Sequence, residues 1–362
     1  MHQIPPTQLF SNLKVIELAG VLAGPAVGMF FAELGATVIK VENKLTGGDV
    51  TRGWKITGED ATAPLSSYYH SVNWGKQSVL VNLKEEQDRN HIYTLLKDAD
   101  IVITNYKKED AIKLGMDYET IKTIQPAIIY AHLKGFENSP RVAFDAIVQA
   151  ETGFMSMNGS NESGPLKLPV AFMDMIAAHL LKEGILTALL QRHKTGEGCY
   201  VETSLEKAGL SSLINQSSAY LNHQVVPTRM GSLHPNIAPY GETFVTADGK
   251  LILLAVGSDE QFRKLCTIIY ASHISDDVKF ATNHQRVKNR DELASLLQQY
   301  IRNLNSSELI LQLETESVPA GIIRNLKDVL DQPSTKKYIL EQKEEDGTIS
   351  KRMMTAAFSL YK

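Results

Sequence analysis

The stretch LKVIELAGVLAGPAVGMFFAELGATVIKVE, residues 13–42, decides the fold of this chain. A short apolar run at 13–18 is followed by a turn with two glycines, and then by residues 26–36, whose apolar positions recur at helical spacing. Residues 37–42 are rich in β-branched side chains, as strands are. The order of strand, glycine-containing turn, helix and strand predicts a βαβ unit, and with it a parallel sheet with ligand sites at the carboxyl ends of its strands.

The alternation of strands and helices continues along the chain. Apolar runs and helical periodicity predict strands at 78–83, 100–105, 127–136 and 200–204, and helices at 85–97, 110–124, 145–159, 173–193 and 205–222. The predicted fold class is therefore α/β, with a doubly wound layer over the first ~150 residues.

A second, smaller α/β domain is expected after this layer. Residues 225–241 are rich in proline and glycine, as ordered loops and linkers are. The following ETFVTADGKLILLAV (242–256) predicts a β-hairpin with Asp248-Gly249 in its turn, and helices then run to about residue 315. A strand at 320–325 would lead back toward the first domain. We therefore divide the chain into 1–224 (large domain), 225–318 (small domain) and 319–362 (return to the large domain).

Composition and charge exclude several classes of protein. The formal net charge of −4 and the sequence pI of about 6.2 give no basic footprint for a nucleic acid. Cys199 and Cys266 have neither metal-ligand nor disulfide-scaffold spacing, which favours a reduced, cytoplasmic location. We find no apolar run of membrane-spanning length and no signal-peptide pattern. We expect no metal, no nucleic acid and no membrane partner.

Three features are candidates for chemistry. The turn at 20–25 lets backbone N–H groups approach a phosphate at a helix N-terminus, although it is equally well a tight turn without a ligand. Asp174 stands among apolar residues in LPVAFMDMIAAHLL (168–181), so its carboxylate must be paired, capped or functional. Asp145 in AFDAIVQA begins another predicted helix. For both acids the alternative is an ordinary N-cap.

Other polar residues carry weaker signals. Lys134 lies at a strand end, Arg52 in the glycine-rich GGDVTRGW (47–54), and His234 and Tyr240 in a proline-rich loop. Each is also typical of a solvated surface or a structural loop. The residues alone indicate an α/β enzyme that binds a phosphate-bearing cofactor, and they leave the reaction open.

Several motifs, in order, resemble the family III CoA-transferases, which include formyl-CoA transferase and crotonobetainyl-CoA:carnitine CoA-transferase. The resemblance covers residues 9 to 361. After the opening βαβ unit it rests on residues 47–54, 98–121 (DADIVITNYKKEDAIKLGMDYETI), 131–136 (AHLKGF), 144–159, 186–208, 234–249 and 318–333.

The resemblance implies a catalytic nucleophile. The family's aspartate falls on Asp174, which would attack an acyl-CoA thioester to form a mixed anhydride and then an aspartyl-CoA thioester. The thioester energy is stored on the enzyme, so neither ATP nor a metal is needed. We take Asp145 as a second candidate catalytic residue.

The resemblance also implies where coenzyme A binds. Gly20, Val21 and Leu22 would hold the adenine and the pantetheine arm, and Asn43 stands where relatives often have an arginine. The remaining positions that match CoA-contacting stretches of the family are Val81, Lys84, Asn105, Tyr106, Lys113 and Lys134. The basic ones suit the CoA phosphates.

The family fold implies an interlocked, ring-shaped homodimer with a Rossmann-like large domain. A glycine run that covers the active site of formyl-CoA transferase has no counterpart in 225–262, so oxalate–formate specificity is not expected.

Three alternatives stay open. A 2-methylacyl-CoA racemase of the same superfamily would need a histidine where this chain has Phe144. A CoA-binding protein without turnover would have no need of Asp174. A dinucleotide-dependent oxidoreductase is disfavoured by the absence of GxGxxG, although Glu42 at the end of the second strand is placed like a ribose-binding acid.

Overall fold

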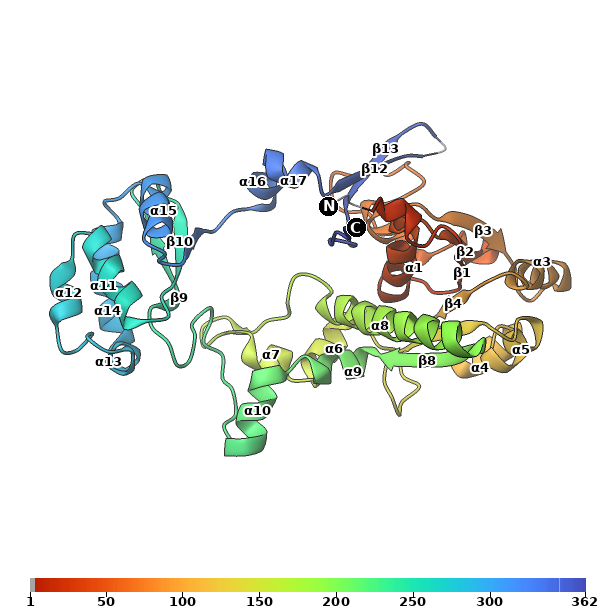
Figure 1. Ribbon diagram of the computed structural model, residues 1–362, viewed down its shortest axis with the longest axis horizontal. Coiled ribbons are helices and arrows are strands. Elements are labelled where there is room, and N and C mark those ends of the chain that lie inside the picture. The colour runs from red at the N-terminus through yellow and green to blue at the C-terminus, as the bar shows by residue number, and fades with distance from the viewer. Residues whose placement is uncertain (1–3, 345) are drawn as a thin grey trace. The chain divides into compact units, whose positions relative to one another are not determined.

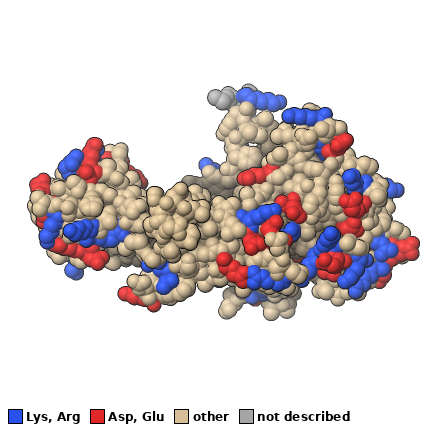
Figure 2. Space-filling view, turned by 90° about the horizontal axis from the view of Figure 1, so that it is seen from below, with Lys and Arg blue, Asp and Glu red and all other residues tan. Residues whose placement is uncertain are grey.

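The computed structural model describes residues 4–344 and 346–362, which form two compact units (Figure 1). The first unit holds the chain up to Phe154, Lys167–Val226 and Lys336–Lys362. The second holds Met155–Leu166 and Pro227–Thr335. On the face shown in Figure 2, basic and acidic side chains are interspersed. None of the described helices is long and apolar enough to cross a membrane.

A six-stranded parallel sheet is the centre of the first unit. Its strand order is β3-β2-β1-β4-β5-β8. The strands are β1 (Lys14–Glu17), β2 (Thr37–Asn43), β3 (Gln77–Val81), β4 (Ile101–Thr104), β5 (Ile129–Lys134) and β8 (Cys199–Ser204). The predicted α/β class with a parallel central sheet is confirmed. The chain runs outward from β1 to β3 and then returns to the other side of β1, so the carboxyl ends of β1 and β4 flank the point where ligands bind in open α/β sheets.

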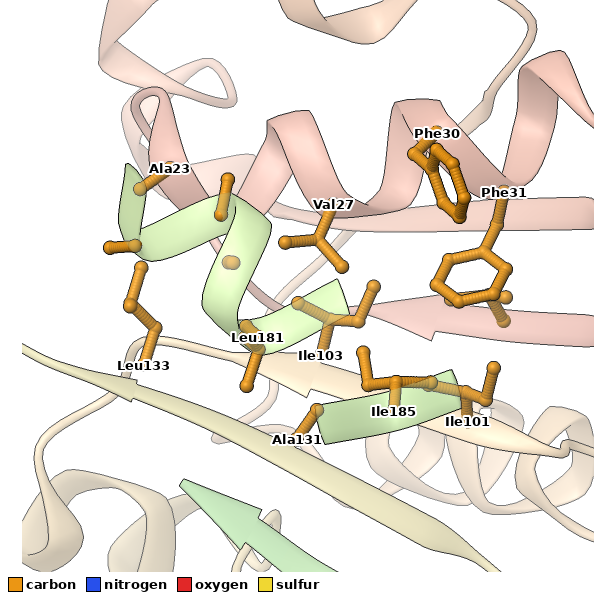
Figure 3. Packing of buried hydrophobic residues seen from close by; sticks show 14 of the residues in the cluster. Ala23, Val27, Phe30, Phe31, Ile101, Ile103, Ala131, Leu133, Leu181 and Ile185 are labelled. Atoms are coloured by element: carbon orange, nitrogen blue, oxygen red, sulfur yellow. The ribbon is translucent and has the colours of Figure 1, made fainter. Parts of the chain in front are cut away.

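Helices cover both faces of this sheet. One face packs against α1 (Ala23–Glu33) and α8 (Phe172–Thr195), and the other against α3 (Glu86–Leu96) and α5 (Tyr118–Ile124). Figure 3 shows the first face: Val27 and Phe31 of α1 lie over β4, beside Leu181 and Ile185 of α8. Each such large apolar side chain contributes about 1.5–3 kcal/mol when buried, so the apolar runs of the strands fix the two long helices.

The first unit also contains shorter elements. These are the 3-10 turns η1 (Pro6–Gln8), η2 (Lys44–Thr46) and η3 (Val50–Gly53), the helices α2 (Ser67–Asn73), α4 (Lys108–Leu114), α6 (Asp145–Glu151), α9 (Leu205–Ser211) and α10 (Ile214–His223), and the hairpin β12 (Ile339–Lys343) and β13 (Ile349–Met353). The C-terminal segment is tied to α1, because the buried Glu33 carboxylate accepts bonds from Arg352 and from the N–H of Ala356.

The second unit is built on the antiparallel sheet β11-β10-β9. Its strands are β9 (Tyr240–Val245), β10 (Leu251–Ala255) and β11 (Ala320–Ile322), and its helices are α11 (Asp259–Ile268), α12 (Ser272–Asp276), α13 (Asn283–Lys288), α14 (Arg290–Ile301), α15 (Ser306–Thr315) and α16 (Leu326–Leu330). The predicted Asp248-Gly249 hairpin is confirmed, with Gly249 in the left-handed region at φ 74°. A small hairpin pairs β6 (Gly159–Ser160) with β7 (Gly164–Pro165), and α7 (Phe154–Met157) and α17 (Pro333–Lys336) span the borders between the units.

Three predicted helices are each broken in two. The helix expected at 110–124 ends at Gly115, which has φ 69°, and restarts at Asp117, whose side chain accepts the N–H of Thr120. Left-handed glycines end helices because they lack a Cβ, and an aspartate N-cap begins a new one. Gly153, with φ 91°, likewise separates α6 from α7. The third break, in 205–222, falls between α9 and α10.

Gly28 is predicted to be intolerant of alanine. Alanine normally favours a helix interior by up to ~1 kcal/mol over glycine. A Cβ at Gly28 would instead lie 1.8 Å from Glu17 Oε2 and displace a fully buried, ion-paired carboxylate. We expect Gly28→Ala to lower the free energy of unfolding by about 3 kcal/mol. Urea unfolding checks this, with Gly53→Ala as the control because its methyl meets nothing within 4 Å. Equal stability of the two variants would contradict the expectation.

Candidate active site

Asp174 lies in the first turn of α8 and is half-buried. It is the third residue of the helix, and the N-cap position belongs to Ala171, whose side chain makes no capping bond. The N-cap interpretation of Asp174 is therefore wrong. The residue lines a cavity of about 460 Å³ at the carboxyl ends of β1, β4 and β5, which we call the nucleophile cavity. Its carboxylate thus faces a space that a small molecule can enter.

Asp145 supplies the cap that α8 lacks. It is the first residue of α6, where Phe144 holds the N-cap position, so it does not cap its own helix as the N-cap interpretation supposed. Its Oδ1 accepts the N–H of Met173 at 2.6 Å, and its Oδ2 accepts from Gln149 Nε2. Gln149 Oε1 in turn accepts the N–H of Leu168 at 2.8 Å. Two side chains of α6 therefore hold the chain just before the candidate nucleophile.

The environment makes Asp174 unusually basic for a carboxylate. Burial raises the pKa of Asp174 to about 7, and the negative charge of Asp145 acts in the same direction. At neutral pH about half of the molecules would carry an ionised Asp174. A carboxylate with a raised pKa is also a stronger nucleophile.

Tyr68 of α2 belongs to the same electrostatic environment. Burial raises the pKa of Tyr68 to about 12, and the charges of Asp174 and Asp145 add to the shift. Its ring lies edge-on to Trp54, with 5.1 Å between centroids. The protonated hydroxyl is a hydrogen-bond donor near the two acids. Sequence reasoning missed this residue, because a tyrosine in a polar helix carries no pattern of its own.

The raised pKa of Asp174 predicts a pH dependence for a reaction in which this candidate nucleophile attacks. Attack would require the ionised form, so the rate would fall as pH drops through the raised pKa of about 7, not near the ordinary value of 3.8. We expect the single-turnover rate to be about 100-fold lower at pH 5 than at pH 8. A stopped-flow pH profile measures this, and a flat profile down to pH 5 would contradict the assignment.

The turn at Gly20 forms another wall of the nucleophile cavity, which is lined by Gly20, Val21, Leu22, Asn105, Tyr106 and Lys134 among others. Asn105 fixes this turn: its Oδ1 accepts the N–H of Gly20 at 3.2 Å and its Nδ2 donates to the Gly20 carbonyl at 3.0 Å. Lys134 Nζ lies 3.9 Å from Glu137 and 3.8 Å from Glu202, which partly neutralise it.

A second cavity, of about 500 Å³, gathers most of the other predicted CoA-binding residues, and we call it the outer cavity. It is lined by Asn43, Val81, Lys84, Tyr106 and Lys113, together with Val41, Glu42, Leu45, Asn82, Leu83, Asp110 and Leu114. Tyr106 lines both cavities. The structure therefore brings the predicted residues together in two groups with one residue in common.

The residues that line the outer cavity differ in how strongly other groups hold their side chains. The Asn43 side chain accepts the N–H of Leu45 at 3.0 Å and so caps the following turn. Val81 is buried and pairs with Asn43 across the sheet. Lys84 and Lys113 are exposed, and Lys113 Nζ lies 3.7 Å from Asp110. The two lysines are the exposed positive charges that line this cavity.

Arg52, His234 and Tyr240 stand apart from these groups. Arg52 is held by Glu42 at 2.7 Å and by Tyr69 at 2.9 Å. Although burial acts in the opposite direction, this pairing lowers the pKa of Glu42 to about 2. His234 and Tyr240 pack ring against ring in the second unit. In the described ranges, no group of three or more His, Cys, Asp or Glu side chains is arranged to hold a metal ion.

The whole chain matches a known family. A family model described as CoA-transferase family III covers residues 10–361. The chain belongs to CoA-transferase family III. The resemblance drawn from the sequence motifs is thereby confirmed, and the protein is an enzyme of this family.

Named members of family III are similar over most of their length. The chain is 38% identical to a succinate–glutarate CoA-transferase of Agrobacterium fabrum, over 94% of this chain and 86% of that protein. It is 33% identical to a human succinyl-CoA:glutarate CoA-transferase, over 97% of this chain and 79% of the relative. The crystal structure of a CAIB/BAIF family protein from Brucella suis superposes with a TM-score of 0.83 at 35% identity, covering 98% of this chain and 92% of the other.

Proposed function

We propose that this family III enzyme moves CoA from an acyl-CoA to a carboxylic acid through covalent intermediates on Asp174. The observation that carries the proposal is the half-buried Asp174, with its raised pKa, facing a cavity that it shares with the Gly20 turn. A carboxylate can take part in such a transfer without ATP or a metal, because the thioester energy is kept on the enzyme.

In each proposed step one bond forms as another breaks, and the total charge is unchanged. Ionised Asp174 attacks the thioester carbonyl carbon, the C–S bond breaks, and a mixed anhydride and a CoA thiolate form. The thiolate attacks the aspartyl carbonyl and releases the donor acid, which leaves an aspartyl-CoA thioester. The acceptor carboxylate repeats both steps in reverse order and departs as its CoA ester, which restores Asp174. Backbone N–H groups near the helix start would stabilise the oxyanions.

The two cavities suggest a path for CoA. We place the nucleotide in the outer cavity, where Lys84 and Lys113 supply charge for the phosphates and Asn43 contributes a neutral side chain in place of an arginine. The pantetheine arm then passes Tyr106 and the turn at Gly20–Leu22, and the thioester reaches Asp174. Asn105 keeps that turn in place, and Lys134 stands at the acyl end.

We propose a small dicarboxylic acid as the acceptor. The relatives at 38% and 33% identity are named for succinate and glutarate. Lys134 and Arg141 line the nucleophile cavity, and although each lies beside a glutamate, both have N–H groups that can donate to a second carboxylate. Incubation with succinyl-CoA and glutarate, oxalate or butyrate, followed by chromatography of the CoA esters, tests this. We expect glutaryl-CoA and little butyryl-CoA. Transfer to butyrate alone would overturn the dicarboxylate assignment.

The racemase alternative lacks a base in the right place. Phe144 occupies the position of the racemase histidine and carries no proton. His132, which does line the nucleophile cavity, has both ring nitrogens engaged, Nδ1 with the Tyr200 hydroxyl at 2.6 Å and Nε2 with the Tyr106 carbonyl at 2.9 Å. Exchange of the α-proton of a 2-methylacyl-CoA in D₂O would favour the racemase instead.

The assembly and compartment complete the proposal. We propose an interlocked homodimer. Each subunit has a Rossmann-like large domain made of residues 1–224 and 319–362, and a small domain made of residues 225–318. The 3-2-1-4-5 strand order at the centre of the sheet supports the Rossmann-like description. Helix α10 buries none of its residues, with Ile214 and Leu221 more than 70% exposed, which supports cover by a second copy. The free Cys199 and Cys266 support a cytoplasmic location.

A further inference from the structure

Four charged side chains are buried together beside the turn at Gly20. Glu17 ends β1, Lys40 lies in β2, and Asp49 and Lys76 come from the connections around η3 and β3. Each side chain is at most 2% exposed. Lys40 Nζ lies 2.9 Å from Glu17 and 3.1 Å from Asp49, and Lys76 Nζ lies 2.8 Å from Glu17. We call these residues the buried ionic cluster.

Stability is a weak reason for such a cluster. Taking a charge out of water costs several kcal/mol, and apolar residues of similar size often stabilise a protein more than a buried ion pair does. None of the four residues lines the nucleophile cavity, so they do not contact a molecule bound there. What distinguishes the cluster is the set of backbone atoms that it holds.

Three members of the cluster bind the loop Ala19–Leu22 and the first turn of α1, which follows it. Lys40 Nζ donates to the Ala19 carbonyl at 2.8 Å. The Asp49 carboxylate accepts the N–H of Val21 at 3.1 Å. Lys76 Nζ donates to the Pro25 carbonyl at 2.8 Å. Glu17 links the two lysines, so one ionic group holds the loop at two points and the start of α1 at a third.

The loop needs this support because it is strained. Val21 has φ 73°, in the left-handed region that β-branched residues avoid. Such strain persists only where the surroundings over-determine the conformation, and it gathers at ligand sites. Here the strained residue forms part of the wall that faces Asp174.

We propose that the buried ionic cluster is a positioning device that holds the loop Ala19–Leu22 in the shape that binds CoA. This inference rests on the proposed function, because it assigns the loop to the CoA arm. The cluster residues are positioning residues: they act through the backbone of the loop and touch neither substrate nor the reacting atoms. Loosening the cluster must therefore weaken acyl-CoA binding more than it slows the chemistry.

Asp60 makes the same local hydrogen bonds as Asp49, so it provides a matched control for a substitution at Asp49. In both Asp49-Val50-Thr51 and Asp60-Ala61-Thr62, one carboxylate oxygen accepts the N–H and the hydroxyl of the threonine two residues on. Asp60 is exposed at the surface, whereas Asp49 also holds Val21 and Lys40. Asp49→Asn places a donor amide against two other donors, and Asp60→Asn does not.

We expect Asp49→Asn to raise the KM for acyl-CoA at least about tenfold while kcat stays within a factor of ~3. Asp60→Asn is expected to keep both constants. Circular dichroism verifies that each variant is folded. A folded Asp49→Asn with the KM of Asp60→Asn would overturn the inference, as would equal losses in kcat and kcat/KM.

A milder pair covers the case in which Asp49→Asn does not fold. Thr51→Val removes only the hydroxyl that donates to Asp49 at 2.8 Å, and Thr62→Val removes its counterpart at Asp60. We expect KM to rise about threefold for Thr51→Val alone. An unchanged KM in that folded variant would count against the cluster as well.

Failure of the inference and failure of the proposed function give different results. If the wild type transfers CoA and the Asp49 and Asp60 variants share one KM, only the inference fails. If the wild type transfers no CoA, the proposed function fails, and calorimetric titration of the same variants with free CoA then decides the inference. Weaker binding by at least about tenfold in Asp49→Asn alone upholds it, and equal affinities overturn it.

Discussion

Asp174→Asn is expected to lower kcat for CoA transfer at least about 10⁴-fold, because a neutral amide cannot attack a thioester or carry the anhydride. The fold should survive, since the Asp174 side chain does not cap α8 and asparagine has nearly the same volume. Steady-state transfer between succinyl-CoA and a dicarboxylic acid measures the loss.

Glu183→Gln is the matched control for Asp174→Asn. It removes a carboxylate from the same helix at an exposed position, and it should leave kcat unchanged. Retention of more than about a tenth of the activity by Asp174→Asn would show that another group forms the covalent bond.

Asp145 is expected to give the second largest effect, and two substitutions separate its two roles. Asp145→Ala removes the acceptor for the Met173 N–H and should cost about 1–2 kcal/mol of stability and about 100-fold in kcat, because the nucleophile is then misplaced. Thermal unfolding and steady-state kinetics measure the two losses.

Asp145→Asn keeps an acceptor for Met173 and removes the negative charge, although its amide N–H then faces the Nε2 of Gln149. The charge of Asp145 helps to raise the pKa of Asp174, so its loss must move the acidic limb of the pH–rate profile below 7. Relative activity at pH 5 should therefore be higher than in the wild type, even if the plateau at pH 8 is lower. An unmoved limb would mean that burial alone sets the pKa.

The central sheet could be predicted because its signals are local. The βαβ pattern of residues 13–42 and the apolar runs near 101 and 129 give β1, β2, β4 and β5 within one or two residues. Gly115 and Gly153 also break helices by a local effect. The apolar periodicity continues on either side of each glycine, so periodicity alone predicts an unbroken helix. Helix α2 and the β12–β13 hairpin have mainly polar sequences, so periodicity missed them.

The candidate site residues could be named from the sequence, but the hydrogen bonds among them could not. Asp174 and the predicted CoA-binding positions come from motifs and lie around the two cavities, whereas the bond from Asp145 to Met173 joins residues 28 positions apart on different helices. The burial of Glu17 and Lys40 could not be predicted either, because a charged residue within a strand pattern normally points to solvent. Its partners Asp49 and Lys76 come from distant parts of the chain.

The most direct test of the account is to trap the activated carboxylate. The enzyme is incubated with succinyl-CoA, treated with hydroxylamine, digested and analysed by peptide mass spectrometry at residue 174. We expect a hydroxamate on Asp174 that requires the acyl-CoA and is absent from Asp174→Asn. Turnover without any hydroxamate at Asp174, or a hydroxamate on a different carboxylate, would contradict it.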